Sequence, residues 1–308
     1  MVRDGAAATT REDVLARLGA LRSHQRDGRR SPHKPLLVLL ALGRLATTGS
    51  SALPWDRAEA ELGNLIGEFG PASGTSRAQS AAYPFTRLRS DGIWLLDRDV
   101  PMDRTGPLSR APVTGRLVPA VERALARDAE LLASAARALV EANFPETIAP
   151  DVLDAVGLDP REVLRAPGRL PLPDDAPRRR AHGWREAIIQ AWDRQCAFCG
   201  FDGQLQGATV GLDAAHVRWF ALDGPDELDN GVALCSLHHK LFDRGVLGID
   251  PDLQVQVSTT YTARTGAGRS VYDLHGKVLR ARPGTVMPAN EHLRWHRRWV
   301  FKGDPLTV

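Results

Sequence analysis

The chain has 308 residues, 43% of them hydrophobic, which is enough for two domains that each bury a core of ordinary size. Its 40 Lys and Arg residues outnumber its 37 Asp and Glu residues only slightly, and its isoelectric point of about 9.0 suits an anionic partner. No apolar run approaches the ~20 residues that span a bilayer, and the N-terminus has no signal-peptide pattern. We therefore expect a cytoplasmic protein without membrane contact, whose thiols stay reduced and available to metal.

The first part of the chain predicts a mainly helical domain. Thr9 and Glu12 form a candidate capping box, and apolar residues recur at helical spacing after them, which predicts a helix over residues 10–23. A basic loop follows. The apolar run that begins at Pro35 predicts a central buried helix, and Pro54 stands at the start of another helix with a buried face.

The next stretch is predicted to pass from a loop to a hairpin and then to one long helix. Residues 70–82 are small and polar, which is typical of a surface loop. Residues 83–97 predict a strand, a turn at Asp91 and Gly92, and a return strand. An alanine-rich pattern then predicts a single helix over residues 118–142, which ends before a proline.

Residues 159–180 are rich in proline and charge, which predicts a linker between a first domain, residues 1–158, and a second domain, residues 181–308. The second domain begins with the helical sequence GWREAIIQAWDRQ and contains every cysteine of the chain. Near its end, GVLGIDPDLQVQVS predicts two short strands and NEHLRWHRRWVF a last helix. Between these two segments lies a glycine-rich basic stretch that is suited to a flexible arm along a DNA backbone, where Arg264 and Arg269 are the best candidates for phosphate contacts.

Four residues of the second domain have the spacing of metal ligands. Cys196 and Cys199 form a Cys-x-x-Cys turn, and Cys235 and His238 form a Cys-x-x-His turn, with 35 residues between Cys199 and Cys235. Two such turns supply four ligands at about 2.0 to 2.3 Å, which closes a tetrahedral zinc site. The alternative is a set of unrelated buried thiols, but buried cysteines rarely fall into ligand-spaced pairs. We predict a structural zinc ion.

The sequences GLDAAHVRW, DNGVALC and SLHHKLFDRG, which surround these ligands, resemble the HNH nucleases. In that family a β-hairpin and a helix, the ββα-metal fold, enclose one catalytic divalent ion. The resemblance implies that His216 is the general base, that Asn230 pins the hairpin and orients that histidine, and that His239 binds the catalytic ion, Mg2+ or Mn2+. An imidazole suits the base role because it titrates near neutral pH.

The sequence offers two candidates for the second ligand of the catalytic ion. Many HNH nucleases carry an acidic residue immediately before the base histidine, where this chain has Ala215. The nearest candidates are Asp213, three residues before the histidine, and Asp243, which lies at i+4 from His239 on the same helical face. We favour Asp213, because the pattern GLDAAH resembles an HNH subgroup with an acid at that position, while Asp243 can tether the helix.

The order RRSPHKPLLVLLALGRL, then YPFTRL, then DGIW resembles the sulfur-binding domain of McrA-like restriction endonucleases, over about residues 10–155. That domain recognises phosphorothioate DNA and is often followed by an HNH domain. Sulfur keeps the phosphate charge but is larger, more polarizable and a weaker hydrogen-bond acceptor, so apolar faces suit the sulfur and cations the remaining oxygens. Tyr83 and Pro84 offer such faces, although they can instead pack into the core. The candidate DNA contacts are Arg29, Arg30, His33, Lys34, Tyr83, Pro84, Arg87, Arg89, Arg110, Arg264 and Arg269.

We therefore predict an α+β protein with a mainly helical N-terminal DNA-reading domain and a C-terminal ββα-metal (HNH) nuclease domain that contains structural Zn2+. It is expected to be a modification-dependent endonuclease that binds phosphorothioate-modified double-stranded DNA and cuts nearby. One HNH site cuts one strand, so a homodimer is expected for a double-strand break. The alternatives are an HNH endonuclease that reads methylated cytosine or unmodified sequence, and a non-catalytic, zinc-stabilised DNA-binding sensor.

Overall fold

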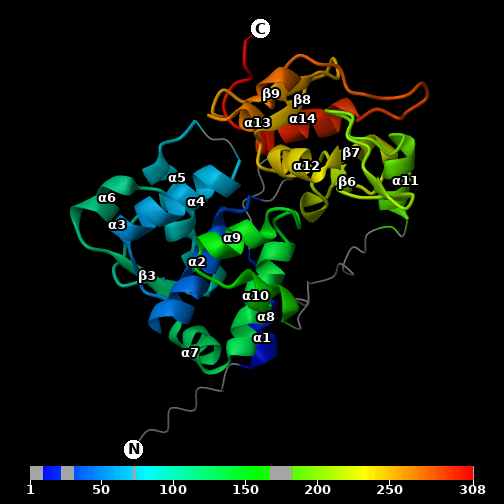
Figure 1. Cartoon of the computed structure of the whole chain (residues 1–308). Coiled ribbons are helices and arrows are strands. Elements are labelled where there is room, and N and C mark those ends of the chain that lie inside the picture. Colours follow the sequence, from blue (N-terminus) through cyan, green and yellow to red (C-terminus); the bar gives the residue numbers. More distant parts are fainter. Residues whose placement is uncertain (1–9, 22–30, 72–73, 167–180, 182, 308) are drawn as a thin grey trace, which may run out of the picture. The chain divides into compact units, whose positions relative to one another are not determined.

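The computed structural model describes residues 10–21, 31–71, 74–166, 181 and 183–307 (Figure 1). Its chain forms two compact units, the first made of Met1–Asn143 and Ala149–Pro177 and the second of Phe144–Ile148 and Arg178–Val308. Among the described residues, no helix is long and apolar enough to cross a membrane. Helices dominate the first unit and small antiparallel sheets the second, which confirms the predicted α+β class.

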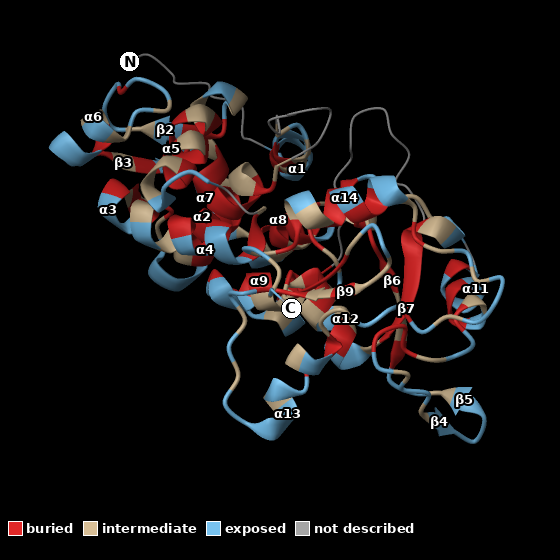
Figure 2. Ribbon diagram, turned by 90° about the horizontal axis from the view of Figure 1, so that it is seen from above, coloured by how far each residue is buried: buried red, intermediate tan, exposed pale blue. Residues whose placement is uncertain are grey.

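Helix α2, His33–Thr48, is the centre of the first unit, and its buried residues are shown in red in Figure 2. Its apolar residues occur on all sides of the helix, as a fully buried helix requires. At Gly43 a Cβ atom would lie 1.7 Å from the carbonyl oxygen of Val156, so only glycine allows this close approach. The other helices of this unit are α1 Arg11–Gly19, α3 Trp55–Arg57, α4 Gly63–Phe69, α5 Arg77–Arg87, α6 Thr105–Arg110, α7 Pro119–Arg127, α8 Ala129–Glu141, α9 Ala149–Ala155 and α10 Pro160–Arg165.

A small antiparallel sheet completes the first unit, with strand order β1-β3-β2. Trp94, at the start of β2, is buried and lies over Gly115 in β3, where a Cβ atom would be 2.3 Å from the indole ring. The strands are β1 Leu53–Pro54, β2 Trp94–Leu96 and β3 Thr114–Leu117.

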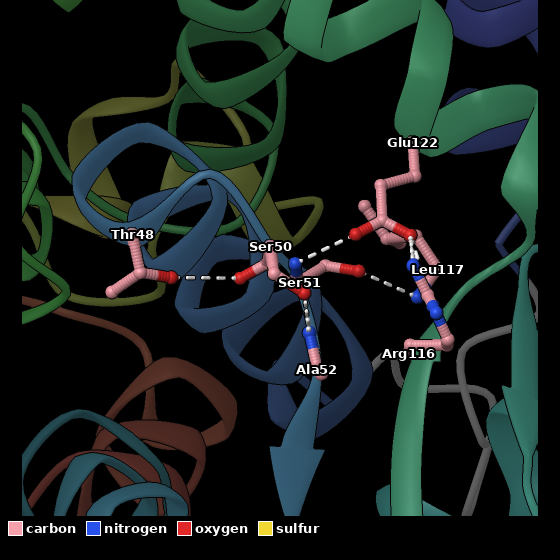
Figure 3. A network of polar contacts seen from close by, with 7 residues as sticks. All are labelled: Thr48, Ser50, Ser51, Ala52, Arg116, Leu117 and Glu122. Atoms are coloured by element: carbon pink, nitrogen blue, oxygen red, sulfur yellow. Dashed lines mark hydrogen bonds and ion pairs between the residues drawn. The ribbon is translucent and has the colours of Figure 1, made fainter.

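A buried polar network joins the end of α2 to this sheet (Figure 3). The carboxylate of Glu122 accepts hydrogen bonds from the backbone N–H of Ser51, at 2.9 Å, and from the guanidinium of Arg116, at 2.5 and 3.0 Å. Ser51 Oγ in turn accepts from the N–H of Leu117 at 3.0 Å. Burial raises the pKa of Glu122, but the Ser51 N–H and Arg116 outweigh it, so the pKa is lowered and the acid stays charged.

The structure corrects the sequence prediction at several points in this unit. Residues 77–87 form helix α5, not a loop and a strand; Ser76 caps this helix by accepting from the N–H of Gln79, and Pro84 lies inside it. The long alanine-rich helix is two helices, because Asp128 has an extended backbone and its side chain caps α8. The first capping box uses Thr10 with Asp13.

The predicted linker also contains regular structure. Helix α10 lies within the segment 159–180, and Ala166 accepts a hydrogen bond from the side chain of Arg137 in α8 at 2.7 Å. Residues 167–180 lie outside the described part of the chain. At its start, the segment predicted to link the domains therefore packs on the first unit.

The second unit is built around the hairpin of β6, Leu212–His216, and β7, Gly231–Cys235, which pair over five residues and lead into α12, Ser236–Asp243. This is the predicted ββα arrangement. Trp184 and Ile188 of α11 belong to the same buried core as the hairpin. The other elements are α11 Trp184–Ala191, β4 Gln204–Leu205, β5 Ala208–Thr209, β8 Leu247–Ile249, β9 Val255–Val257, α13 Gly266–Arg269 and α14 Asn290–Trp299.

The C-terminal predictions are partly confirmed. The strands β8 and β9 pair as expected, and α14 is the predicted last helix. The stretch between them is not a free arm, because it contains α13 and is hydrogen-bonded to β9. The backbone N–H of Val255 donates to the carbonyl of Lys277, and the N–H of Gly276 donates to the carbonyl of Val255. Leu274 and Leu279 are buried, so this stretch belongs to the core of the unit.

The contact of Trp94 with Gly115 allows a test by overpacking. Gly115→Ala should lower the free energy of unfolding by about 1–3 kcal/mol or more, because the new methyl group must displace a buried indole. Gly106→Ala is the matched control, since no atom lies within 4 Å of its added Cβ in helix α6, and it should leave the stability unchanged or raise it by up to about 1 kcal/mol. The measurement is denaturant unfolding of the full chain, and equal effects of the two substitutions would contradict the packing described here.

Candidate functional site

The four predicted zinc ligands meet in the second unit. One ligand atom from each of Cys196, Cys199, Cys235 and His238 lies within 4.8 Å of the others. The Nδ1 atom of His238 is 3.5 Å from the sulfur of Cys196 and 3.2 Å from that of Cys235. Tetrahedral zinc with bonds of about 2.3 Å to sulfur and 2.0–2.1 Å to nitrogen separates these atoms by about 3.5 Å. The cluster therefore fits a tetrahedral metal ion such as zinc.

The three thiols of the cluster differ in pKa because they interact with one another. A hydrogen bond from Cys235 is the main cause that lowers the pKa of Cys196 to about 3, and the pKa of Cys235 is raised mainly by the same interaction. Burial raises the pKa of Cys199. Without a cation the cluster thus favours one thiolate and two thiols, whereas a bound metal ion makes all three sulfurs thiolates.

The cluster also fixes the backbone around the hairpin. The N–H of Ala197 donates to the carbonyl of Ala233 in β7 at 2.8 Å, and the N–H of Ser236, the first residue of α12, donates to Gly211 at 3.0 Å. Cys235 is the N-cap residue of α12 and His238 lies in its first turn. The metal ligands thereby join the turn at residues 196–199 to the hairpin and to the start of the helix.

His216 is the last residue of β6 and is buried. Its Nε2 atom lies 2.7 Å from Oδ1 of Asp226, a residue that the sequence did not single out. The indole of Trp184 stacks on the imidazole, with ring centroids 3.8 Å apart and an angle of 15° between the planes. The ring is held between an aromatic face and a carboxylate.

Asn230 is fully buried and joins the two ends of the connection between β6 and β7. Its Oδ1 atom accepts from the N–H of Arg218 at 2.8 Å. Its Nδ2 atom donates to the carbonyls of Arg218, at 3.0 Å, and Pro225, at 2.9 Å. These contacts pin the loop that follows His216.

His239, on α12, lies between two carboxylates. Its Nδ1 atom is 3.6 Å from Oδ2 of Asp213, and its Nε2 atom is 3.3 Å from Oδ2 of Asp243. Nδ1 is buried and has no hydrogen-bond partner among the described residues. Burial lowers the pKa of His239, but the charges of Asp243 and Asp213 outweigh it and raise the pKa to about 9. A divalent ion would supply the missing partner of Nδ1, so these residues fit a second metal site.

The surroundings of the two carboxylates differ. Asp243 is 2% exposed; its Oδ1 atom accepts from Trp219 Nε1 at 3.1 Å, and its Oδ2 atom from the hydroxyl of Thr147. Asp213 is 42% exposed, and its Oδ2 atom accepts a long hydrogen bond, 3.4 Å, from Ser236. Asp213 is therefore the better candidate for a metal ligand and Asp243 for the group that orients His239. Sequence reasoning missed Trp219 and Thr147.

Three of the predicted DNA contacts of the first unit have acidic partners. The ammonium group of Lys34 lies 2.5 Å from a carboxylate oxygen of Asp91, and Arg87 makes two hydrogen bonds, at 2.7 and 2.5 Å, to Asp103. Arg89 donates to the carbonyl of Val100 at 2.8 Å and to a carboxylate oxygen of Asp99 at 3.2 Å, so it also has an acidic partner.

The remaining candidates are divided between helices and exposed positions. Tyr83 and Pro84 lie on α5, where Pro84 is buried and the guanidinium of Arg87 lies 5.4 Å from the centre of the Tyr83 ring. His33 begins α2. Arg110, Arg264 and Arg269 are exposed, while Arg29 and Arg30 lie outside the described residues.

Two sequence families match the chain. Residues 11–161 match the family described as the ScoMcrA-like DNA sulfur-binding domain, and residues 196–250 match an HNH endonuclease family. The second match includes the Cys3His cluster, His216, Asn230 and His239. No curated protein matches the chain.

Several solved structures are similar. The sulfur-binding domain of ScoMcrA in complex with phosphorothioated DNA is 23% identical, with a TM-score of 0.42, over 49% of this chain and 97% of that chain. The corresponding domain of SprMcrA, also in complex with phosphorothioated DNA, is 26% identical, with a TM-score of 0.40, over 48% and 94%. The type IV phosphorothioation-dependent restriction endonuclease ScoMcrA is 13% identical, with a TM-score of 0.38, over 83% and 85%.

The two family matches occur in the order that the sequence motifs predict, and the ββα hairpin lies inside the second of them. Residues 11–161 therefore belong to the DNA sulfur-binding domain family and residues 196–250 to the HNH endonucleases, so the chain is a DNA endonuclease in which the sulfur-binding segment comes first.

Proposed function

We propose that this endonuclease binds phosphorothioate-modified double-stranded DNA and hydrolyses phosphodiester bonds nearby with a one-metal HNH site. The reading function belongs to residues 1–158 and the cutting function to residues 181–308, with residues 159–180 as the connection. The nuclease proposal rests mainly on the buried Nδ1 atom of His239, which has no hydrogen-bond partner in the described part of the chain and lies 3.6 Å from the carboxylate of Asp213. The same hairpin and helix also carry His216.

Two kinds of metal ion have separate roles in this proposal. Cys196, Cys199, Cys235 and His238 hold a structural Zn2+ ion. His239 and Asp213 hold Mg2+ or Mn2+, which when bound supplies positive charge at the scissile phosphate. Asp243 keeps the ring of His239 oriented by accepting from its Nε2 atom.

His216 acts as the general base. A neutral imidazole can take the proton of an attacking water, which makes the water a competent nucleophile toward phosphorus. Asn230 holds the loop after His216 and so limits the positions that the ring can take. By resemblance to HNH nucleases, the products carry a 3'-hydroxyl and a 5'-phosphate.

The sulfur is recognised in the first unit by apolar contact and by cations. Tyr83 is the proposed ring face next to Pro84, and His33, Lys34, Arg29 and Arg30 are the proposed cations around the phosphate. Lys34, Arg87 and Arg89 must share their charge between DNA and the acids Asp91, Asp103 and Asp99. Nonspecific affinity for DNA comes mainly from cationic side chains that neutralise phosphates, and these acidic partners reduce that contribution. Contacts to the sulfur then account for a larger share of the binding free energy. The further proposed DNA contacts are Arg110, Arg264 and Arg269.

Each HNH site hydrolyses one strand. A double-strand break then needs two copies of the chain, so we propose that two copies act together on DNA as a homodimer or as a pair assembled on the duplex.

The structural metal is tested by comparing two neighbouring residues of α12. His238→Ala should remove zinc from the purified protein and lower its melting temperature, because the metal joins the turn at residues 196–199 to the helix. Leu237→Ala is the control, since this side chain is exposed and next to the ligand. Metal analysis and thermal unfolding measure the outcome; full zinc content in His238→Ala would exclude the proposed site.

The catalytic metal is tested through Asp213. Asp213→Asn should raise the Mn2+ concentration needed for half-maximal cleavage of phosphorothioate-containing DNA by about 10- to 100-fold or more, because even outer partners of metal ligands have effects of this size. Asp202→Asn removes an exposed carboxylate of the same unit and should leave the Mn2+ dependence unchanged. An unchanged Mn2+ dependence in Asp213→Asn would show that Asp213 is not a ligand.

Sulfur recognition is tested with two otherwise identical duplexes. One is made by polymerase extension with the four α-thio nucleotides, so that many sequence contexts carry sulfur, and the other with ordinary nucleotides. The protein should bind the first more tightly at matched salt, and Tyr83→Ala should reduce this preference by about tenfold, which corresponds to ~1.4 kcal/mol. Leu95→Ala, an exposed position of the same unit, should not change it. Equal binding of both duplexes by the unmodified protein would reject the sulfur proposal and leave methylated or unmodified DNA as the target.

A further inference from the structure

Asp226 lies in the connection between β6 and β7 and faces the proposed base. Its Oδ1 atom is 2.7 Å from Nε2 of His216, and the two side chains are 9% and 8% exposed. An ionised carboxylate can only accept a hydrogen bond, so in this pair the histidine nitrogen donates. The lone pair of the neutral imidazole is then on Nδ1, which fixes the tautomer of the ring.

The loop holds Asp226 in place from both sides. The carbonyl of Pro225 accepts from the side chain of Asn230 at 2.9 Å, and the carbonyl of Glu227 accepts from Trp184 Nε1 at 3.1 Å. The second carboxylate oxygen of Asp226 accepts from the N–H of Ala181 at 2.5 Å. The position of this carboxylate is therefore determined by contacts before it, after it and at its own side chain.

The same contacts connect the family asparagine to the base. Asn230 bonds to the backbone at Arg218 and Pro225, which are the segments directly after His216 and directly before Asp226. Trp184 contributes twice, because its indole ring stacks on His216 while its Nε1–H holds the carbonyl of Glu227. Asn230 and Trp184 can thus orient the base through the loop and Asp226.

We propose that Asp226 is a positioning residue for the nuclease reaction, which holds His216 in one tautomer and stabilises the ring when it becomes charged. This rests on the proposed function of His216 as the general base. In the reaction an O–H bond of water breaks and its proton passes to the imidazole, while the water oxygen forms a bond to phosphorus. The bond from phosphorus to the 3'-oxygen breaks, and that oxygen takes a proton from solvent. The imidazolium left behind lies against the Asp226 carboxylate until it returns its proton to solvent.

The burial of the pair supports this function. The Asp226 side chain is 9% exposed, so its carboxylate has lost most of its hydration free energy. A hydrogen bond from a neutral imidazole offsets only part of this loss. The attraction becomes much larger when the ring carries a positive charge, which happens only as the water loses its proton. Asp226 therefore favours the charged state of the reaction over the resting state.

The test uses the full chain in single-turnover cleavage of the α-thio duplex with Mn2+. Asp226→Asn should slow cleavage by about 10²- to 10⁴-fold, the range typical of general base catalysis, with DNA affinity and zinc content unchanged. Asp226→Glu, which keeps a carboxylate, should recover part of the rate. Asp223→Asn is the control, because Asp223 is exposed in the same loop and asparagine tolerates its left-handed backbone, φ 65°.

A double substitution separates positioning from a general structural effect. If Asp226 acts through His216, the double variant His216→Ala with Asp226→Asn should cleave at the rate of His216→Ala alone. If the rate losses of the two single variants instead multiply in the double variant, the inference is overturned. A normal rate of Asp226→Asn beside an inactive His216→Ala would also overturn it, whereas a normal rate of His216→Ala would overturn the proposed function itself.

A measurement on the unsubstituted protein keeps the inference testable if a variant does not fold. The ¹⁵N–¹H NMR spectrum of the His216 ring near neutral pH should show the proton on Nε2 and none on Nδ1. The opposite tautomer would overturn the inference, because Asp226 would then not accept from Nε2.

Discussion

The Cys3His cluster is the constraint on which the nuclease unit depends. The strands β4 and β5 each have two residues, and β6 and β7 pair over only five, so hydrogen bonds alone give this region little stability. A metal ion held by Cys196 and Cys199 on one side and by Cys235 and His238 on the other would join segments that are far apart in sequence. Cys235 is the N-cap residue of α12, so a metal ion held by it and by His238 would lie at the start of the helix that carries His239.

The residues proposed for metal binding and for proton transfer lie at the two ends of β6. Near its start, Asp213 faces His239 on α12, and this end has the buried nitrogen and the partly exposed carboxylate that suit a divalent ion. At its end, His216 lies between Trp184 and Asp226, where aromatic stacking and a carboxylate suit proton transfer. Residues 213 and 216 are three positions apart on this strand, so their Cα atoms lie about 10 Å apart, and their side chains extend from the two ends of the hairpin strand.

Features that depend on local spacing could be predicted from the sequence, and features that depend on long-range contacts could not. The metal cluster, the ββα order and the buried helix α2 follow from ligand spacing and apolar periodicity. Helix α5 was missed because small polar residues and Pro84 indicate a loop, while its stability comes from a buried face. Nothing in the local pattern distinguishes Asp226 from Asp223, since only the fold brings Asp226 to His216.

The participation of every cysteine of the chain in one cluster has a consequence for oxidative stress. An oxidant that converts any of these thiolates to a sulfenic acid or a disulfide removes a metal ligand and would lower the affinity of the cluster for a metal ion. The start of α12 would then separate from the turn that precedes β4, and His239 would no longer be held against Asp213. Oxidation of this one cluster is therefore expected to disturb the second unit, which contains all four of these residues.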